Sequence, residues 1–174
     1  MTDGETGITT AGAGAGTFPV SGHDHARCFA GLMAHVDRLC AETGVRLTAQ
    51  RRRVLEIVAG SHAAVGAYDI LARMNETGRP VAPIAVYRAL DFLLQNGLVH
   101  RMESLNAYVV CSRAGERHRA QFLICRRCHC VAEFTSPSID MAIAAGAEAA
   151  AFEVTEPVIE IGGLCPGCRP GLAG

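Results

Sequence analysis

Two Cys-x-x-Cys pairs carry the strongest chemical signal in this chain. Cys125 and Cys128 form the first pair, and Cys165 and Cys168 form the second. Each pair follows an apolar run typical of a β-strand, so pairing of those strands would bring the four thiolates together. Four thiolates at this spacing offer the tetrahedral sulfur cage that structural zinc prefers. Four reduced core cysteines are the plainer alternative, but Cys165-Pro-Gly-Cys168 is typical of a turn.

Four further residues form a second potential ligand set. His100 and Cys111 lie on two predicted strands, His118 follows them, and Glu133 comes just after the first cysteine pair. Two imidazoles, one thiolate and one carboxylate suit four-coordinate zinc better than six-coordinate iron or manganese. Each residue also has a plainer interpretation: a packed or solvated histidine, an apolar strand cysteine or a surface carboxylate. Spacing alone leaves these alternatives open.

Positive charge is unevenly distributed along the 174 residues, although the net charge at pH 7 is only −1. Residues 46–101 contain eight Arg and four Asp or Glu, whereas residues 1–45 contain two Arg and five Asp or Glu. This local excess of positive charge lies where a nucleic-acid-binding module needs it. The length is enough for one medium domain or two small ones.

The first residues show no targeting segment. Asp3 and Glu5 stand where a basic stretch would precede an apolar one, and no apolar run in the chain is long enough to cross a bilayer. The chain contains eight cysteines, which in a reducing compartment bind metal or react instead of forming structural disulfides. We therefore expect a cytoplasmic protein without membrane contact.

Residues 23–111 predict a winged helix-turn-helix domain. Residues 1–22, rich in Gly, Ala and Thr, predict a disordered tail. Apolar spacing, Thr48 as an N-cap and Pro83 in a first turn predict helices at 29–39, from 48, at 67–75 and at 84–96. Two strand-like runs, 98–102 and 107–111, then form a hairpin. Helices followed by a hairpin are the layout of a winged helix-turn-helix.

Residues 112–119 are polar and arginine-rich and predict a hinge. Residues 120–174 predict a small α/β domain, with strands at about 120–125, 131–134 and 154–161 and a helix at about 137–151. The whole chain is therefore expected in the α+β class. A C-terminal unit of this size is marginal by itself, which favours bound metal and dimerisation as supports.

Several segments of the chain share the pattern of one protein family. They are Leu47-Thr-Ala-Gln-Arg51, Gly66-Ala-Tyr-Asp-Ile-Leu71, Val86-Tyr-Arg-Ala-Leu-Asp-Phe-Leu-Leu94, His100-Arg-Met-Glu-Ser104, Asn106-Ala-Tyr-Val-Val-Cys111 and the two cysteine pairs. With these segments the sequence resembles the ferric uptake regulator family of metal-sensing repressors, and within it the zinc uptake regulator branch. The resemblance extends from about residue 25 to residue 168.

This resemblance implies an N-terminal winged helix, a hinge and a C-terminal dimerisation domain that holds the four-cysteine zinc. It also implies that His100, Cys111, His118 and Glu133 form a regulatory zinc site, so that each monomer binds two Zn²⁺ ions. Zinc there would fix the angle between the domains, and zinc sufficiency would repress zinc-uptake genes. The implied partners are a second copy of the chain and double-stranded DNA with an inverted repeat. No enzymatic activity, small-molecule substrate or membrane is implied.

Six residues are candidates for DNA contact. Arg88, on the fourth predicted helix, would read guanine through two hydrogen bonds to O6 and N7 in the major groove. Tyr87 beside it and Tyr68 on the third helix would contact a thymine methyl group, a base edge or phosphate. The run Arg51-Arg52-Arg53 would contact phosphate, which positions the protein without reading sequence. A packed tyrosine and a solvated arginine face are the alternatives.

Two features depart from the family pattern. His129 and Cys130 directly follow the first cysteine pair, where family members commonly have small or polar residues. Cys130 could compete for metal or oxidise, although a half-buried strand cysteine is the simpler interpretation. His23 and His25 lie in an N-terminal extension outside the family core. We expect a solvated tail there, and an extra metal contact is the alternative.

Other functional classes fit the sequence less well. Cys125-Arg-Arg-Cys-His129 matches the c-type haem attachment pattern, but such haem is attached outside the cytosol. Cys165-Pro-Gly-Cys168 resembles a thioredoxin-like motif, but Pro170 and Gly171 exclude the helix that would lower a thiol pKa. The His-x-Glu and Pro-Cys-x-x-Cys of a zinc deaminase are absent. Within the family, a sensor of iron, manganese, peroxide or haem is the closer alternative, and Cys111 favours zinc.

Overall fold

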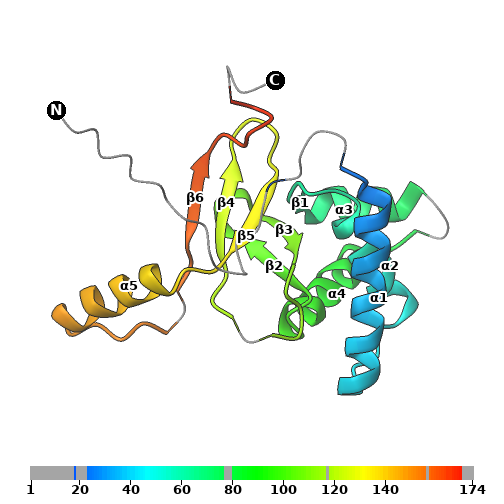
Figure 1. Ribbon diagram of the computed structural model, residues 1–174. Coiled ribbons are helices and arrows are strands. Elements are labelled where there is room, and N and C mark those ends of the chain that lie inside the picture. Colours follow the sequence, from blue (N-terminus) through cyan, green and yellow to red (C-terminus); the bar gives the residue numbers. More distant parts are fainter. Residues whose placement is uncertain (1–17, 19–22, 77–79, 117, 156, 170–174) are drawn as a thin grey trace.

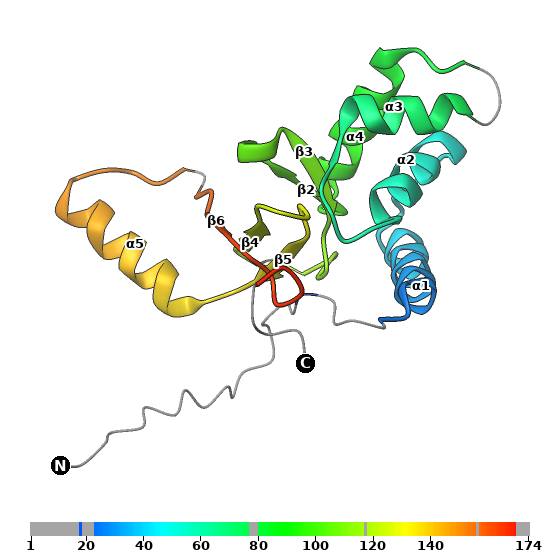
Figure 2. The same ribbon diagram turned by 90° about the horizontal axis from the view of Figure 1, so that it is seen from above.

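Five α-helices and two small β-sheets account for most of the regular structure of the described residues (Figure 1; Figure 2). The computed structural model describes residues 18, 23–76, 80–116, 118–155 and 157–169. Helices α1 to α4 gather at one end, the sheets lie in the middle, and α5 projects from the other end. The α+β class expected from the sequence is confirmed. Within the described ranges, no helix combines the length and apolar character needed to cross a membrane.

Four helices build the larger hydrophobic core. They are α1 (His25–Thr43), α2 (Ala49–Ala59), α3 (Ala67–Glu76) and α4 (Pro83–Gln95). The Thr48 hydroxyl accepts a hydrogen bond from the Arg51 N–H at the start of α2, and Pro83 occupies the first turn of α4. Both positions follow the known preferences of helix N-termini. Leu55 of α2 and Leu90 of α4 are fully buried in this core.

The first sheet is the wing, which takes one strand from between α2 and α3 and its other two strands from after α4. Its antiparallel strands lie in the order β1 (Val65–Gly66), β3 (Ala107–Val110) and β2 (Val99–Met102). A single turn of 3₁₀ helix, Glu103–Leu105, connects β2 to β3, so the predicted hairpin is present. The sequence did not predict β1, because two residues are too few to show an alternating pattern.

The second sheet has the order β5 (Val131–Phe134), β4 (Gln121–Cys125) and β6 (Glu160–Gly163). β4 is antiparallel to β5 and parallel to β6, and the chain between β5 and β6 contains α5 (Pro137–Ala149). The strand expected from residue 154 begins only at Glu160. Pro157 lacks the N–H that the interior of a strand donates, which explains the later start.

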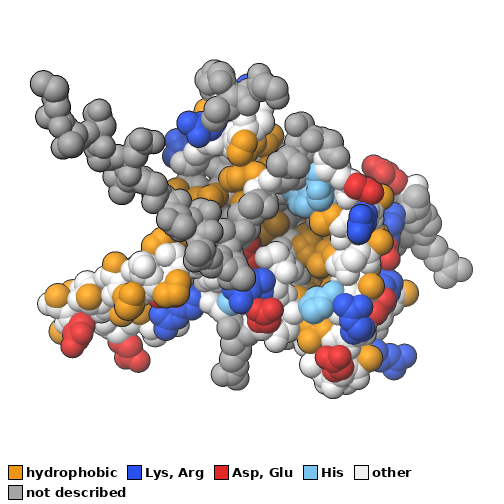
Figure 3. Space-filling model, in the orientation of Figure 1, with side chains coloured by type: hydrophobic (Ala, Val, Ile, Leu, Met, Phe, Trp, Pro, Cys, Tyr) orange, Lys and Arg blue, Asp and Glu red, His pale blue; other side chains and the backbone are white. Residues whose placement is uncertain are grey.

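Among the contacts described, helix α5 touches the second sheet only near its first turn, where Gln121 Nε2 of β4 donates a hydrogen bond to Asp140 Oδ1 at 3.2 Å. None of its residues is buried, and it extends away from both sheets (Figure 1; Figure 2). Hydrophobic side chains are exposed along this projection (Figure 3); Met141 is 65% exposed and Phe152, just after the helix, 68%. A helix with an apolar surface needs another element to cover it. This end of the molecule therefore offers an uncovered apolar surface.

The N-terminal half (α1–α4 and β1–β3) contacts the C-terminal half (β4–β6 and α5) through the two sheets. A small hydrophobic cluster joins the sheets and consists of Met102, Val109, Phe122, Ile124 and Val131. The carboxylate of Glu160 adds a polar contact, because it accepts hydrogen bonds from the N–H groups of Glu103 and Ser104 at 2.6 and 3.0 Å. The two halves are thus linked by both apolar and polar contacts.

Helix α1 begins earlier than the sequence predicted. The carboxylate of Asp24 accepts a hydrogen bond from the Arg27 N–H at 3.0 Å and caps the helix. His25 is the first helical residue and is partly buried, so the expectation of a solvated tail is wrong for this residue. Apart from Phe18, the tail expected over residues 1–22 lies outside the described residues.

Gly115, between the two halves, packs against α1, and we predict that Gly115→Ala is destabilising. Gly115 has a φ of +88°, and a Cβ atom there would lie 2.7 Å from Leu39 Cδ1. The left-handed backbone alone costs about 1–2 kcal/mol of unfolding free energy, and displacement of Leu39 adds to that loss. Gly97→Ala is the matched control, because Gly97 has a φ of +62° and nothing within 4 Å. Urea unfolding of the zinc-loaded protein measures both variants; equal losses would contradict the packing argument.

Candidate metal centres

The two cysteine pairs meet at one end of the second sheet and form the cysteine group (Cys125, Cys128, Cys165 and Cys168). Cys125 ends β4, and its register partner on β6 is Gly163, two residues before Cys165. The four Sγ atoms lie within 4.8 Å of one another, and those of Cys128 and Cys165 are 3.7 Å apart. Tetrahedral zinc with Zn–S bonds of ~2.3 Å separates its sulfur ligands by about 3.8 Å. The group therefore has the donors and spacing that zinc requires.

The backbone around the cysteine group favours a thiolate at Cys125, whereas hydrogen bonding to Cys165 raises the pKa of the Cys168 thiol to about 12. Hydrogen bonding from the backbone, chiefly at Cys165, lowers the pKa of the Cys125 thiol to about 6. The thiolate is the form that binds metal. The N–H groups of Cys168 and Arg169 donate to the Cys165 carbonyl at 2.9 and 3.0 Å and close the second turn. All eight cysteines are free thiols, so this group is not a pair of disulfides.

His129 and Cys130 lie beside the cysteine group and act through their backbones. Burial raises the pKa of the Cys130 thiol to about 11, so the side chain stays protonated near neutral pH. The Cys130 carbonyl accepts from the Cys125 N–H at 2.9 Å, and Cys130 forms a β-bridge with Ala63. The His129 carbonyl accepts from the Ala64 N–H at 3.2 Å. These two residues thus connect the C-terminal half to the chain segment between α2 and β1.

The second predicted ligand set also converges, and we call it the hinge group (His100, Cys111, His118 and Glu133). His100 lies on β2, Cys111 follows β3, His118 lies in the connection between the halves, and Glu133 lies on β5. Their ligand atoms lie within 4.8 Å of one another. Glu133 Oε1 is 2.5 Å from His118 Nε2, 3.4 Å from His100 Nε2 and 3.9 Å from Cys111 Sγ. The group therefore takes donors from both halves and from the connection.

Glu133 is a charged residue in a buried position, only 7% exposed. Burial raises the pKa of this carboxyl, but the facing His100 imidazole and the Ser112 N–H outweigh burial and lower the pKa to about 2. Ser112 donates to Glu133 Oε2 from its N–H at 2.8 Å and from its hydroxyl at 2.9 Å. The carboxylate is therefore negatively charged at neutral pH.

The hinge group fits a zinc ion better than it fits a set of hydrogen bonds. Burial, followed by the charge of Glu133, raises the pKa of the Cys111 thiol to about 12. His100 Nε2 is buried and has no hydrogen-bond partner among the described residues. Two neutral imidazoles, one thiolate and one carboxylate would balance the charge of Zn²⁺. A cation here would use the unsatisfied imidazole and displace the thiol proton.

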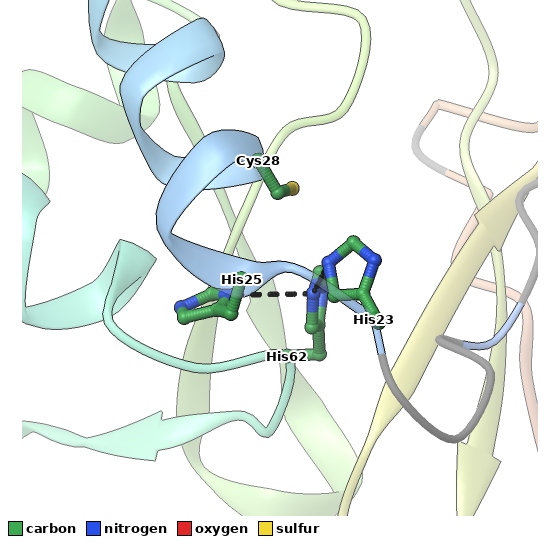
Figure 4. Close-up of side chains that lie close together, drawn as sticks. All are labelled: His23, His25, Cys28 and His62. Atoms are coloured by element: carbon green, nitrogen blue, oxygen red, sulfur yellow. Dashed lines mark hydrogen bonds between the residues drawn. The ribbon is translucent and has the colours of Figure 1, made fainter.

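A third group of metal-binding side chains includes His23 and His25, for which an extra metal contact was the alternative to the expected solvated tail. The ligand atoms of His23, His25, Cys28 and His62 lie within 4.8 Å of one another (Figure 4), and we call these residues the N-terminal group. The His-x-His-x-x-Cys spacing of residues 23–28 is a signal that could have indicated it. Nothing in the sequence marks His62, which joins the other three only through the tertiary structure.

Three of the six candidate DNA-contact residues are exposed on α3 and α4. Tyr68 on α3 is 77% exposed and Tyr87 on α4 is 40% exposed. Arg88, also on α4, is exposed and forms no ion pair with the residues described. These side chains are accessible to a macromolecular partner, and their contact with DNA stays a prediction.

The arginine run at the start of α2 has partners within the chain. Arg52 forms an ion pair with Asp37. The Arg51 guanidinium lies 3.4 Å from the centre of the Phe92 ring, close enough for a cation–π interaction. Arg53 Nη1 is 3.6 Å from Glu56 Oε2. The three side chains remain at least partly exposed, so their predicted contact with phosphate is neither excluded nor tested.

The chain is similar to known metal-dependent regulators. The model of the ferric uptake regulator family matches residues 42–161. The zinc uptake regulation protein of Escherichia coli (strain K12) is 38% identical over 138 residues, which cover 79% of this chain and 81% of that protein. This chain belongs to the ferric uptake regulator family. The family expected from the sequence is thus confirmed.

Other family members resemble the chain in sequence and in fold. The ferric uptake regulation protein of Legionella pneumophila is 32% identical over 131 residues, covering 74% of this chain and 94% of that protein. A solved zinc uptake regulator complexed with zinc and DNA superposes with a TM-score of 0.71 at 35% identity, covering 82% of this chain and 93% of that one. Holo XcZur gives a TM-score of 0.69 at 40% identity, covering 79% and 95%.

Zinc binding at the hinge group should strengthen as pH rises. The Cys111 thiol, with a pKa of about 12, keeps its proton until the metal displaces it, so each binding event releases that proton. The apparent zinc affinity of this site should therefore rise about tenfold per pH unit above about pH 7. Competition with a chromophoric chelator measures the slope, and Cys111→Ser should reduce it. An equal slope in the variant would show that Cys111 is not a ligand.

Proposed function

We propose that this chain is a zinc-responsive transcriptional repressor. It binds operator DNA as a homodimer when zinc occupies the hinge group, and it represses zinc-uptake genes. The observation that carries the proposal is the hinge group itself, whose donors come from both halves and from their connection. The similar proteins include a zinc uptake regulation protein and a zinc uptake regulator complexed with zinc and DNA. The chain is accordingly a regulator and not an enzyme.

The proposed division of labour follows the two halves. Residues 23–111 form the winged-helix DNA-binding domain, residues 112–119 the hinge, and residues 120–174 the dimerisation and metal-binding domain. The separate hydrophobic cluster of α1–α4 supports this division. The DNA-binding domain would place α4 in the major groove, with Arg88 at base edges and Tyr68 and Tyr87 beside it. A dimer presents two such helices, so the operator is an inverted repeat.

The cysteine group and the hinge group have different proposed roles. The cysteine group offers four sulfur donors from two turns of the C-terminal half and holds a structural zinc ion permanently. The hinge group offers one sulfur with two imidazoles and a carboxylate, taken from both halves and their connection, so it binds more weakly and responds to zinc supply. These two sites account for two Zn²⁺ ions per monomer.

The hinge residues explain how zinc would change the affinity for DNA. Bound zinc would supply the positive charge that the buried hinge donors lack. Glu133 already holds the end of the wing through the N–H and hydroxyl of Ser112. Engagement of His100, the donor without a hydrogen-bond partner, would fix the wing relative to β5. A coupling of about 1–3 kcal/mol would raise DNA affinity roughly 5–150-fold.

The uncovered apolar surface supports dimerisation through the C-terminal half. Met141 on α5 and Phe152 just after it are exposed there, and exposed hydrophobic residues continue along the chain to the end of β6 (Val154, Val158, Ile161 and Leu164). β6 is also an edge strand, whose outer N–H and C=O groups have no strand partner in this sheet. A second copy of the chain would cover this surface and steady the small domain. The free thiols and the DNA target suit the cytoplasm.

A different signal is the alternative within the family, and Cys111 argues against it. A buried thiolate in a four-donor set suits zinc, whereas iron and manganese take more oxygen and nitrogen donors. A thiol redox function has less support. Pro170 and Gly171 follow Cys168 closely in the sequence and disfavour the helix that activates a redox thiol.

Substitution of Cys111 tests the proposed function. Cys111→Ser should bind one zinc ion fewer than the wild type and still dimerise, because the cysteine group and α5 are unchanged. Zinc should no longer raise its operator affinity by the roughly 5–150-fold expected of the wild type. Cys40→Ser, in α1 and outside all three metal-binding groups, is the matched control. Fluorescence anisotropy on zinc-uptake promoter DNA measures the response; a wild-type response in Cys111→Ser would reject the proposal.

Substitution of Arg88 tests sequence reading by α4. The comparison DNA is the operator with the guanine that Arg88 reads replaced by another base. Arg88→Ala should lose about 1–3 kcal/mol of the discrimination between these two DNAs. Arg38→Ala, an exposed arginine on α1, should leave that discrimination unchanged. Anisotropy titrations of both variants with both DNAs provide the measurement. Equal loss on both DNAs in Arg88→Ala would indicate a phosphate contact instead.

A further inference from the structure

The N-terminal group is a cluster of metal-binding side chains that the proposed function does not use. His62 Nε2 is 3.3 Å from His25 Nδ1 and 3.0 Å from His23 Nε2. Figure 4 shows the rings of His23 and His25 on either side of His62, with Cys28 further along α1. Three ring nitrogens and one thiol thus converge within 4.8 Å.

Local structure explains why three of these residues lie together. Asp24 caps α1, so His23 stands just before the helix and His25 opens it. His25 and Cys28 are three residues apart and therefore share one face of the helix. His62 reaches the same point from the segment between α2 and β1. The cluster therefore joins the start of α1 to a distant part of the chain.

Hydrogen bonding alone does not satisfy this arrangement. A ring nitrogen has either one proton to donate or one lone pair with which to accept, yet His62 Nε2 faces two other ring nitrogens. Burial, together with His25 and His23, lowers the pKa of His62, which favours the neutral imidazole that binds metals.

A zinc ion would satisfy the same arrangement. Zn–N bonds of ~2.0–2.1 Å in a tetrahedron separate two nitrogen ligands by about 3.3 Å, which is close to the distances from His62. The donors are three imidazoles and one thiolate, a set that suits zinc and not the oxygen-preferring magnesium, calcium or manganese. We propose that His23, His25, Cys28 and His62 form a third zinc site.

This site is distinct from the two sites already described. It shares no residue with the cysteine group or the hinge group. The family model matches residues 42–161, so three of its four donors precede the matched region. The fourth donor, His62, lies within the matched region.

The position of His62 gives the third site a mechanical role. The His62 carbonyl accepts a hydrogen bond from the Val131 N–H on β5 at 2.9 Å, and the next residue, Ala63, pairs with Cys130. Zinc at the third site therefore ties the start of α1 to the junction of the two halves. One cavity of about 460 Å³ is lined by residues of this group and by Cys111 and Glu133 of the hinge group. The third site and the hinge group thus both lie at the contact between the N-terminal and C-terminal halves.

A metal count on the full-length dimer tests the site. After loading with zinc chloride and gel filtration, native mass spectrometry should find three zinc ions per chain in the wild type. The double variant His23→Gln/Cys28→Ser should bind two, and both side chains are exposed, so its fold should be intact. Cys40→Ser is the control and should bind three. Two ions in the wild type, or three in the double variant, would overturn the proposal.

Limited proteolysis tests the link between α1 and the junction. Arg27 lies between two of the donors, and trypsin cleaves after it only when the first turn of α1 opens. Zinc at ten times its dissociation constant should slow this cleavage about tenfold in the wild type and leave the rate unchanged in His23→Gln/Cys28→Ser. The zinc count of the double variant shows whether the cysteine group and the hinge group keep their ions, so a loss at those sites would be recognised independently of the proteolysis. Equal protection of both proteins would overturn the assignment of these donors.

Discussion

One buried carboxylate, that of Glu133, connects the two halves of this molecule. A charge in such a position is costly unless donors or a cation compensate for it. Ser112 supplies two hydrogen bonds from the end of the wing, and His118 supplies a contact from the connection. The compensation remains incomplete, because His100 faces the carboxylate without a proper hydrogen bond. The junction therefore holds together without a metal ion, but a cation would compensate the Glu133 charge more completely and would bind the His100 imidazole. A metal-dependent switch needs this property.

The three metal-binding groups differ in charge and exposure, and this difference orders their expected behaviour. Four thiolates more than neutralise Zn²⁺, a thiolate and a carboxylate balance it, and a single thiolate leaves an excess of positive charge. The cysteine group has two buried members, Cys125 and Cys165, whereas no member of the N-terminal group is buried. We expect zinc to be retained most firmly by the cysteine group and most loosely by the N-terminal group. Such an order would let the junction tighten in stages as zinc becomes available.

The C-terminal half depends on partners because its own core is small. The cluster that contains Phe122, Ile124 and Val131 is completed by Met102 and Val109 from the wing. α5 contributes no buried residue. Stability therefore has to come from the metal-binding turns, from the contact with the wing and from a second copy of the chain over the apolar surface. The same elements that stabilise this half also carry its function.

Short-range signals were sufficient to predict much of the fold. Thr48, Pro83 and the Cys-x-x-Cys turns act within a few residues of themselves, so their helices and turns could be expected directly from the sequence. The hinge residues are ordinary when taken singly. Their residue types made a shared ligand set one possibility, and the resemblance to a family singled it out. Only the tertiary structure brings the side chains of His100 and Glu133 side by side.

The tertiary structure alone decided the features that depend on distant contacts. β1 exists because Val65 pairs with Tyr108, and a two-residue strand leaves no periodic trace in the sequence. Asp24 could have been recognised as a helix cap, but the position of His62 beside His25 follows from the packing of α1 near the α2–β1 segment. Sequence thus determined the elements and the types of donor, because those depend on neighbouring residues. Folding decided which donors meet, because that depends on the pairing of segments far apart in the chain.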